Sequence, residues 1–175
     1  MRSSHISFYQ KSRYSLSLVL MSLYLSISMA SETRVGDSIY LEGKTQGQTL
    51  GLESRYVKFD SGLMKQTQIT FLGGTPVNSE DVYVDEQEVL TPEVAGLIVA
   101  MCDSLGGTQE TLQLPVGTTL TCKIDSQSLH HIPGSLYRVL ELLGNRVWIG
   151  PFPVLGIAQF EIDNDLIVIQ KYHWN

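Results

Sequence analysis

The segment that decides the fold is Gln159-Phe-Glu-Ile-Asp-Asn-Asp-Leu-Ile-Val-Ile-Gln-Lys-Tyr172, close to the C-terminus. Its Asn164-Asp165 dipeptide favours a turn and lies between two apolar runs, which predicts a β-hairpin with strands over residues 159–163 and 166–172. The second run, Leu166–Ile169, is apolar at every position. We therefore expect this strand to lie in the middle of a sheet or beneath a covering layer.

Further short segments of the same kind precede this hairpin. They are rich in β-branched and aromatic residues and end at Gly, Pro, Asn or Asp, as is typical of strands. The predicted strands cover residues 38–43, 50–59, 67–72, 81–90, 109–114 and 117–125. Together they indicate an α+β fold: a mostly antiparallel β-sheet, or a small and partly open barrel, with a helix packed against it.

One helix is predicted over about residues 92–105. Thr91 is a suitable N-cap, Pro92 suits the first helical position, and Gly106 supplies a left-handed stop. An apolar stripe at helical spacing is expected to face the core; it consists of Val94, Leu97, Ile98, Met101 and Leu105.

The segment over about residues 136–143 is ambiguous. Its Leu and Val residues at helical spacing predict a second short helix that ends at Gly144. The same residues could instead form a strand that pairs with Arg146–Ile149 across Gly144-Asn145.

Residues 1–30 have the pattern of a cleavable secretory signal peptide. Arg2, Lys11 and Arg13 are the only charges before Glu32, an apolar-rich run follows over residues 14–27, and the segment ends in small residues up to Ala30. This order predicts export to the periplasm or the extracellular space, and a single domain over residues 31–175 with no membrane span.

The charge balance argues against nucleic acid as a partner. The chain has 12 Lys and Arg against 18 Asp and Glu over 175 residues, a formal net charge of −6. Residues 1–30 hold three of the basic residues and none of the acids, so the mature chain would carry 9 − 18 = −9. Such an acidic chain is poorly suited to nucleic acid, which requires cationic surface.

Cys102 and Cys122 are the only cysteines of the chain. An even pair in an exported protein predicts one disulfide, which would tie the helix to the strand over 117–125. A nucleophilic cysteine is the alternative, but no catalytic signature surrounds either residue.

The histidines carry the enzymatic alternative. Adjacent His130 and His131 point in different directions and no ligand-spaced partners accompany them, so we predict no metal site and no cofactor. If the protein is an enzyme, a small exported hydrolase, the residues to test are His131, Asp125 and His173.

Two further features bear on binding. Five carboxylates lie within residues 80–88, which we interpret as a solvated acidic edge strand or linker rather than a calcium site. Tyr172 and Trp174, near the C-terminus, are possible contacts for a partner, although docking on the sheet would explain them equally well.

These observations favour an exported, non-enzymatic domain that binds a protein or a glycan. The motifs of common hydrolases, phosphate-binding loops and zinc proteases are absent from the sequence. A hydrolase assembled only in the fold, and a carrier with a ligand inside a barrel, remain alternatives.

Overall fold

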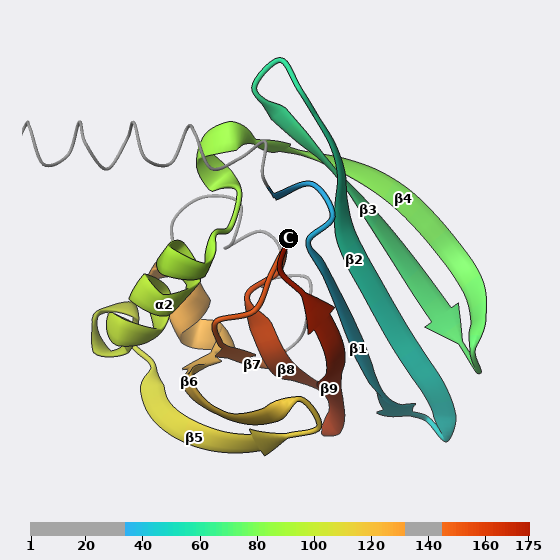
Figure 1. Ribbon diagram of the computed structural model, residues 1–175. Coiled ribbons are helices and arrows are strands. Elements are labelled where there is room, and N and C mark those ends of the chain that lie inside the picture. Colours follow the sequence, from blue (N-terminus) through green and yellow to red (C-terminus); the bar gives the residue numbers. More distant parts are fainter. Residues whose placement is uncertain (1–33, 132–144) are drawn as a thin grey trace, which may run out of the picture.

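A computed structural model describes residues 34–131 and 145–175, and its strands form one nine-stranded antiparallel sheet (Figure 1). The strands are β1 (Ser38–Thr45), β2 (Gln48–Asp60), β3 (Leu63–Leu72), β4 (Thr75–Asp85), β5 (Thr108–Leu114), β6 (Gly117–Asp125), β7 (Arg146–Ile149), β8 (Ile157–Ile162) and β9 (Asp165–His173). Their order in the sheet is β4-β3-β2-β1-β9-β8-β7-β6-β5. The end strands β4 and β5 do not pair with each other, so the sheet is not closed into a barrel. The predicted α+β class with a mostly antiparallel sheet is confirmed.

The C-terminal hairpin forms as predicted and occupies the centre of the sheet. Strand β9 pairs with β8 on one side and with β1 on the other. The turn residues are Asp163 and Asn164, whose φ angles are 50° and 71°, so the turn lies one residue earlier than predicted. Both residue types tolerate this left-handed conformation. Because β1 joins β9, the first and last described strands hold the two halves of the sheet together.

The hairpin of β3 and β4 corrects the prediction for residues 81–90. Gly73 and Gly74 have φ angles of 57° and 81° and form a two-residue turn, so β4 already begins at Thr75. Pro76 falls within β4, which is acceptable because β4 lies at the end of the sheet. The strand ends at Asp85, and the 3₁₀ helix η2 (Glu86–Glu88) follows.

The predicted helix is shorter than expected. Helix α2 (Pro92–Ala100) is followed by the 3₁₀ helix η3 (Cys102–Leu105), and Thr91 caps α2 as predicted by accepting a hydrogen bond from the Val94 amide at 3.3 Å. Gly106 has a φ of 73° and provides the left-handed stop.

The predicted core-facing stripe of this helix is only partly correct: Ile98 and Leu105 are partly buried and pack against the core. Leu97 and Met101 are 52% and 47% exposed, whereas Ala95, Val99 and Cys102 are buried. The cause is the change to a 3₁₀ helix after Ala100 together with the disulfide, which holds Cys102 against β6 and so decides which face of the segment turns inward.

Most of the core lies on the face of the sheet that α2 and the loop over residues 150–156 cover (Figure 1), while Trp148 is buried on the other face of β7. Tyr56 links β2 to the segment before α2 and to the loop over residues 150–156. Its buried hydroxyl accepts a hydrogen bond from the Leu90 amide at 3.3 Å and donates one to the Val154 carbonyl at 3.4 Å. The segment 136–143, predicted as a helix or strand, lies outside the described residues. Arg146–Ile149 forms β7, which pairs with β6 and β8.

Candidate functional site

The predicted disulfide is present. The Sγ atoms of Cys102 and Cys122 are 2.04 Å apart, so neither cysteine is a free nucleophile. Both residues are fully buried, and a Cβ at Gly107 would lie 2.6 Å from the sulfur of Cys122. The bridge therefore fixes the end of the helical segment against the middle of β6.

The structure does not bring Asp125 and His173 together. Asp125 is at the end of β6, level with Leu166 through the pairing of successive strands, whereas His173 ends β9. Seven residues of extended chain between Leu166 and His173 correspond to about 23 Å. The backbone of His131 lies in the 3₁₀ helix η4 (Ser126–His131), and its side chain is outside the described part. The Asp125 carboxylate instead lies 3.7 Å from the Arg146 guanidinium.

The C-terminal aromatics both pack against the protein itself. Tyr172 is 43% exposed and contacts Phe152 edge-to-face, with the ring centroids 5.1 Å apart. Trp174 is half-buried, with the Arg34 guanidinium 5.9 Å from the centre of its ring. A role of Tyr172 and Trp174 in partner contact stays a prediction.

A buried carboxylate joins the two ends of the described chain. Asp37 is fully buried, and its Oδ1 accepts a hydrogen bond from the Asn175 amide at 2.5 Å. Its Oδ2 has no hydrogen-bond partner, and the Arg34 guanidinium lies 3.8 Å away. Burial raises the pKa of Asp37 despite the hydrogen bond from Asn175 and the charges of Arg34 and His173. The hydrogen bond from the Asn175 amide holds the last residue next to the start of β1, and burial of the Asp37 carboxylate costs desolvation energy.

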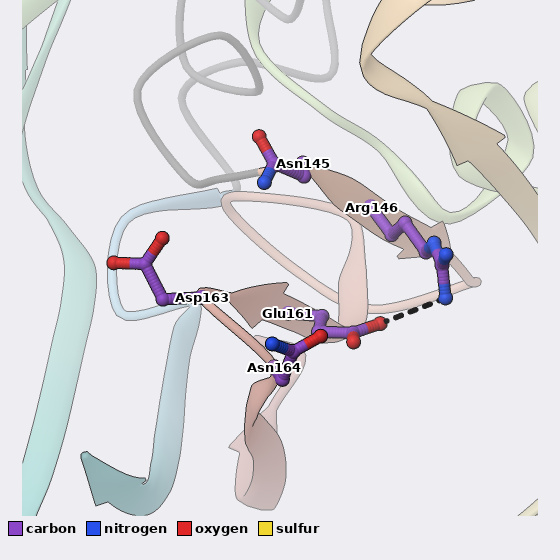
Figure 2. Close-up of a pocket in the computed structure, with 5 residues that line it drawn as sticks. All are labelled: Asn145, Arg146, Glu161, Asp163 and Asn164. Carbon is purple, nitrogen blue, oxygen red and sulfur yellow. Dashed lines mark hydrogen bonds and ion pairs between the residues drawn. The ribbon is translucent and has the colours of Figure 1, made fainter. Parts of the chain in front are cut away.

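A polar hollow of about 180 Å³ lies at the turn between β8 and β9 (Figure 2). Its lining residues are Asn145, Arg146, Glu161, Asp163 and Asn164. Figure 2 shows the Arg146 guanidinium directed to Glu161, and the two groups are 3.4 Å apart. Drug-sized ligands usually occupy pockets of about 300–1,000 Å³ with mostly apolar linings. The hollow is smaller and its cation is already paired, so it is a weak candidate for a ligand site.

No metal site is evident in the described ranges. Within residues 34–131 and 145–175, no three His, Cys, Asp or Glu side chains gather closely enough to hold an ion. In the same ranges, no helix has the length and hydropathy required to cross a bilayer.

The strongest candidate for function is the outer edge of β4, residues Thr75–Asp85, which we term the β4 edge. Strand β4 pairs with β3 on one side, and its other side is the end of the sheet (Figure 1). All seven residues from Thr75 to Asp81 are exposed. Backbone amides and carbonyls that point away from β3 have no partner strand among the residues described, so they are available to another chain.

The charges of the β4 edge are all negative. It contains Glu80, Asp81 and Asp85 and no Lys or Arg. Of the acidic run interpreted as an edge strand or linker, residues 80–85 lie in this end strand and residues 86–88 form η2. Asp81 accepts hydrogen bonds at 2.8 Å from both Lys65 and Thr67 of β3, and these bonds lower its pKa. Glu80 points to the opposite face, where its neighbour across the strand pair is the uncharged Gln68.

Two features limit uncontrolled pairing along this edge. Pro76 lacks an amide hydrogen, and Val77 is the extra residue of a β-bulge opposite Thr70 and Phe71. Bulges and prolines at sheet ends are known protections against aggregation. The regular part of the edge therefore extends from Asn78 to Asp85. Sequence reasoning identified the acids but missed the length of the strand, which the Gly73-Gly74 turn signal could have indicated.

Comparison with known proteins gives no match: no protein-family model, curated protein or solved structure is significantly similar to this chain.

Proposed function

We propose that this protein is an exported, non-enzymatic binding domain that docks an extended segment of another polypeptide along the β4 edge. The observation that carries the proposal is the long and exposed outer side of β4, which pairs with no other strand among residues 34–131 and 145–175. Addition of a strand to a free sheet edge is a common mode of peptide recognition, in which main-chain hydrogen bonds supply affinity and alternate side chains supply specificity.

The edge favours a polypeptide over the alternative ligands. A glycan cannot continue the amide ladder of a sheet, whereas an extended peptide can. A carrier would need an enclosed interior, and the open order of the strands does not support one. For the enzymatic alternative, the distance between Asp125 and His173 excludes only a site that contains both. The predicted pairs of His131 with Asp125 or with His173 stay predictions, because the His131 side chain lies outside the described part.

Export is supported by two independent features. The first thirty residues have the order of a secretory signal, and the chain contains a disulfide between its two cysteines. Disulfides persist mainly in oxidising compartments such as the periplasm and the extracellular space. These two features support our proposal that the protein is exported to one of these two compartments.

Hydrogen–deuterium exchange with a synthetic peptide tests the binding mode. The probe is a capped ten-residue peptide of Thr, Val and Gln, added in excess to the mature protein. We expect slower exchange of amides in β4, and no change in the other end strand, β5. The control is the same peptide N-methylated at alternate residues, which cannot complete the ladder. Unchanged exchange in β4 with the unmodified peptide would overturn the proposal.

A further inference from the structure

The charge of the β4 edge indicates what kind of segment it receives. Resting on the proposed function, we infer that the docked segment is cationic, an extended stretch with a Lys or Arg placed beside Glu80. The proposal has three supports: the charges on the edge, the absence of a self-complementary edge in the same molecule, and the exposed side chains that border it.

Glu80 is the acid of the edge that a ligand would meet. Asp81 is held by Lys65 at 2.8 Å, and Asp85 accepts a hydrogen bond from the Gln87 amide at 3.0 Å. Glu80 is exposed, and the residue beside it on β3, Gln68, carries no charge. A cation on an incoming strand would therefore gain an ion pair without displacing an existing one. Opposite charges on directly facing strand positions are stabilising, and like charges are destabilising.

A second copy of this chain does not fit the edge. The other end strand, β5, has the sequence Thr-Gln-Glu-Thr-Leu-Gln-Leu and also lacks Lys and Arg. Antiparallel pairing of two β4 edges would bring the acids at positions 80 and 81 of one copy close to those of the other. Neither kind of self-pairing between the described end strands would place a Lys or Arg beside Glu80, so we assign the complementary strand to a different chain.

The side chains along the edge are suited to long cationic residues. Tyr83 is 63% exposed and lies two positions from Asp81, on the same face of the strand. This face is opposite to that of Glu80, so the ring would contact a residue next to the cation in the docked strand, and it can pack on the alkyl part of a long side chain there. Val77, 59% exposed, offers an apolar contact near the start of the strand. The edge thus combines acids with apolar surface, as a basic and partly apolar strand requires.

The test compares three peptides with one backbone design, in which the Gln positions are kept, changed to Lys or changed to Glu. Binding to the mature protein is measured by fluorescence anisotropy at low and high salt, and its location by hydrogen–deuterium exchange. We expect the Lys peptide to bind at least about fivefold more tightly than the Gln peptide, with the advantage reduced at high salt. The Glu peptide should bind most weakly.

Variants of the protein locate the charge effect. Glu80→Lys is expected to weaken binding of the Lys peptide by about three- to tenfold, and Glu80→Gln by less. Asp103→Lys makes the same charge change at an exposed position of η3 and should leave the affinity unchanged. Because Glu80 is exposed, circular dichroism of both variants should match the parent protein.

The outcomes separate the two proposals. If all three peptides protect β4 equally, the edge binds strands without regard to charge, which overturns the cationic inference and leaves the proposed function intact. If no peptide protects β4, both fall. Protection at another site, or equal weakening by Glu80→Lys and Asp103→Lys, would show a general charge effect and would also overturn the inference.

Discussion

The hydroxyl group of Tyr56 provides a direct test of how the fold is held together. Tyr56 is 2% exposed, and its hydroxyl bonds the Leu90 amide at 3.3 Å and the Val154 carbonyl at 3.4 Å. Tyr56→Phe keeps the ring and removes both bonds. A neutral hydrogen bond contributes about 0.5–1.5 kcal/mol net, and a buried polar group left without a partner costs about 1–3 kcal/mol. Because both bonds are long, we expect a loss of about 2 kcal/mol in the free energy of unfolding.

Urea unfolding followed by circular dichroism measures this loss, with Tyr83→Phe as the matched control. Tyr83 is 63% exposed, so its variant should lie within about 0.5 kcal/mol of the parent protein. The slope of free energy against urea should stay the same in both variants, because neither changes the surface exposed on unfolding. If Tyr56→Phe is as stable as Tyr83→Phe, the two bonds do not hold these segments and the reasoning is refuted.

A pH titration adds a readout that packing alone would not change. Burial raises the pKa of Tyr56 above its ordinary value of 10.0 in the folded protein. The folded state therefore keeps a proton that the unfolded state releases, and stability falls as pH rises beyond about 10. Tyr56→Phe should reduce this alkaline loss, and an identical alkaline slope in the variant would contradict the assignment.

Three further changes test the ends, the centre and the cross-link of the sheet. Asp37→Asn should raise the free energy of unfolding at neutral pH. Burial raises the pKa of Asp37 in the folded protein, so the stability that this carboxyl group contributes in acid is lost as pH rises above its ordinary pKa of 3.8. The free energies of unfolding measured at pH 4 and pH 7 should therefore differ less in the variant than in the parent protein. Gly43→Ala would place a Cβ 2.2 Å from the Leu166 carbonyl oxygen, so it should lower the free energy of unfolding by at least about 2 kcal/mol in thermal unfolding. The control Gly96→Ala lies in open space on α2 and should raise it by about 0.5–1 kcal/mol. Equal effects of the two substitutions would contradict the close approach of β1 and β9. Replacing both cysteines by Ala opens a loop with a sequence separation of 20 and should cost about 3 kcal/mol in urea unfolding, while two titratable thiols in the unreduced parent protein would disprove the bridge.

Local sequence signals predicted the C-terminal hairpin, the strand pair over residues 109–125 and the helix start, because each depends on neighbouring residues. The Thr91 cap and the Gly106 stop are satisfied by bonds within a few residues, and so are the turns of the sheet. The orientation of α2 was not predictable in this way. A mostly apolar helix has no clear polar face, so its position is chosen by what packs on it, here the bridge from Cys102 to β6.

At the candidate site, too, some features were predictable from the local sequence and others only from the structure. The acidic run over residues 80–88 was recognised as an edge strand or linker from its charges, and β4 is indeed an end strand. That β4 begins at Thr75, and that Glu80 lacks a charged neighbour while Asp81 has Lys65, follows only from the register with β3. This register follows from the Gly73-Gly74 turn, the bulge at Val77 and the pairing along the two strands, and no strand was predicted over residues 75–80.

The sequence by itself determined that this chain forms a mostly antiparallel sheet with one helix, and that its two cysteines could be bridged. Periodicity, turn residues and caps act over a few positions, which is why they can be read without a structure. The tertiary structure decided between alternatives that the sequence left open: β9 is central, the sheet is not closed into a barrel, and β4 is an end strand and not a linker. These properties depend on which strands meet across long stretches of chain: β9 pairs with both β1 and β8, and the end strands β4 and β5 do not pair with each other.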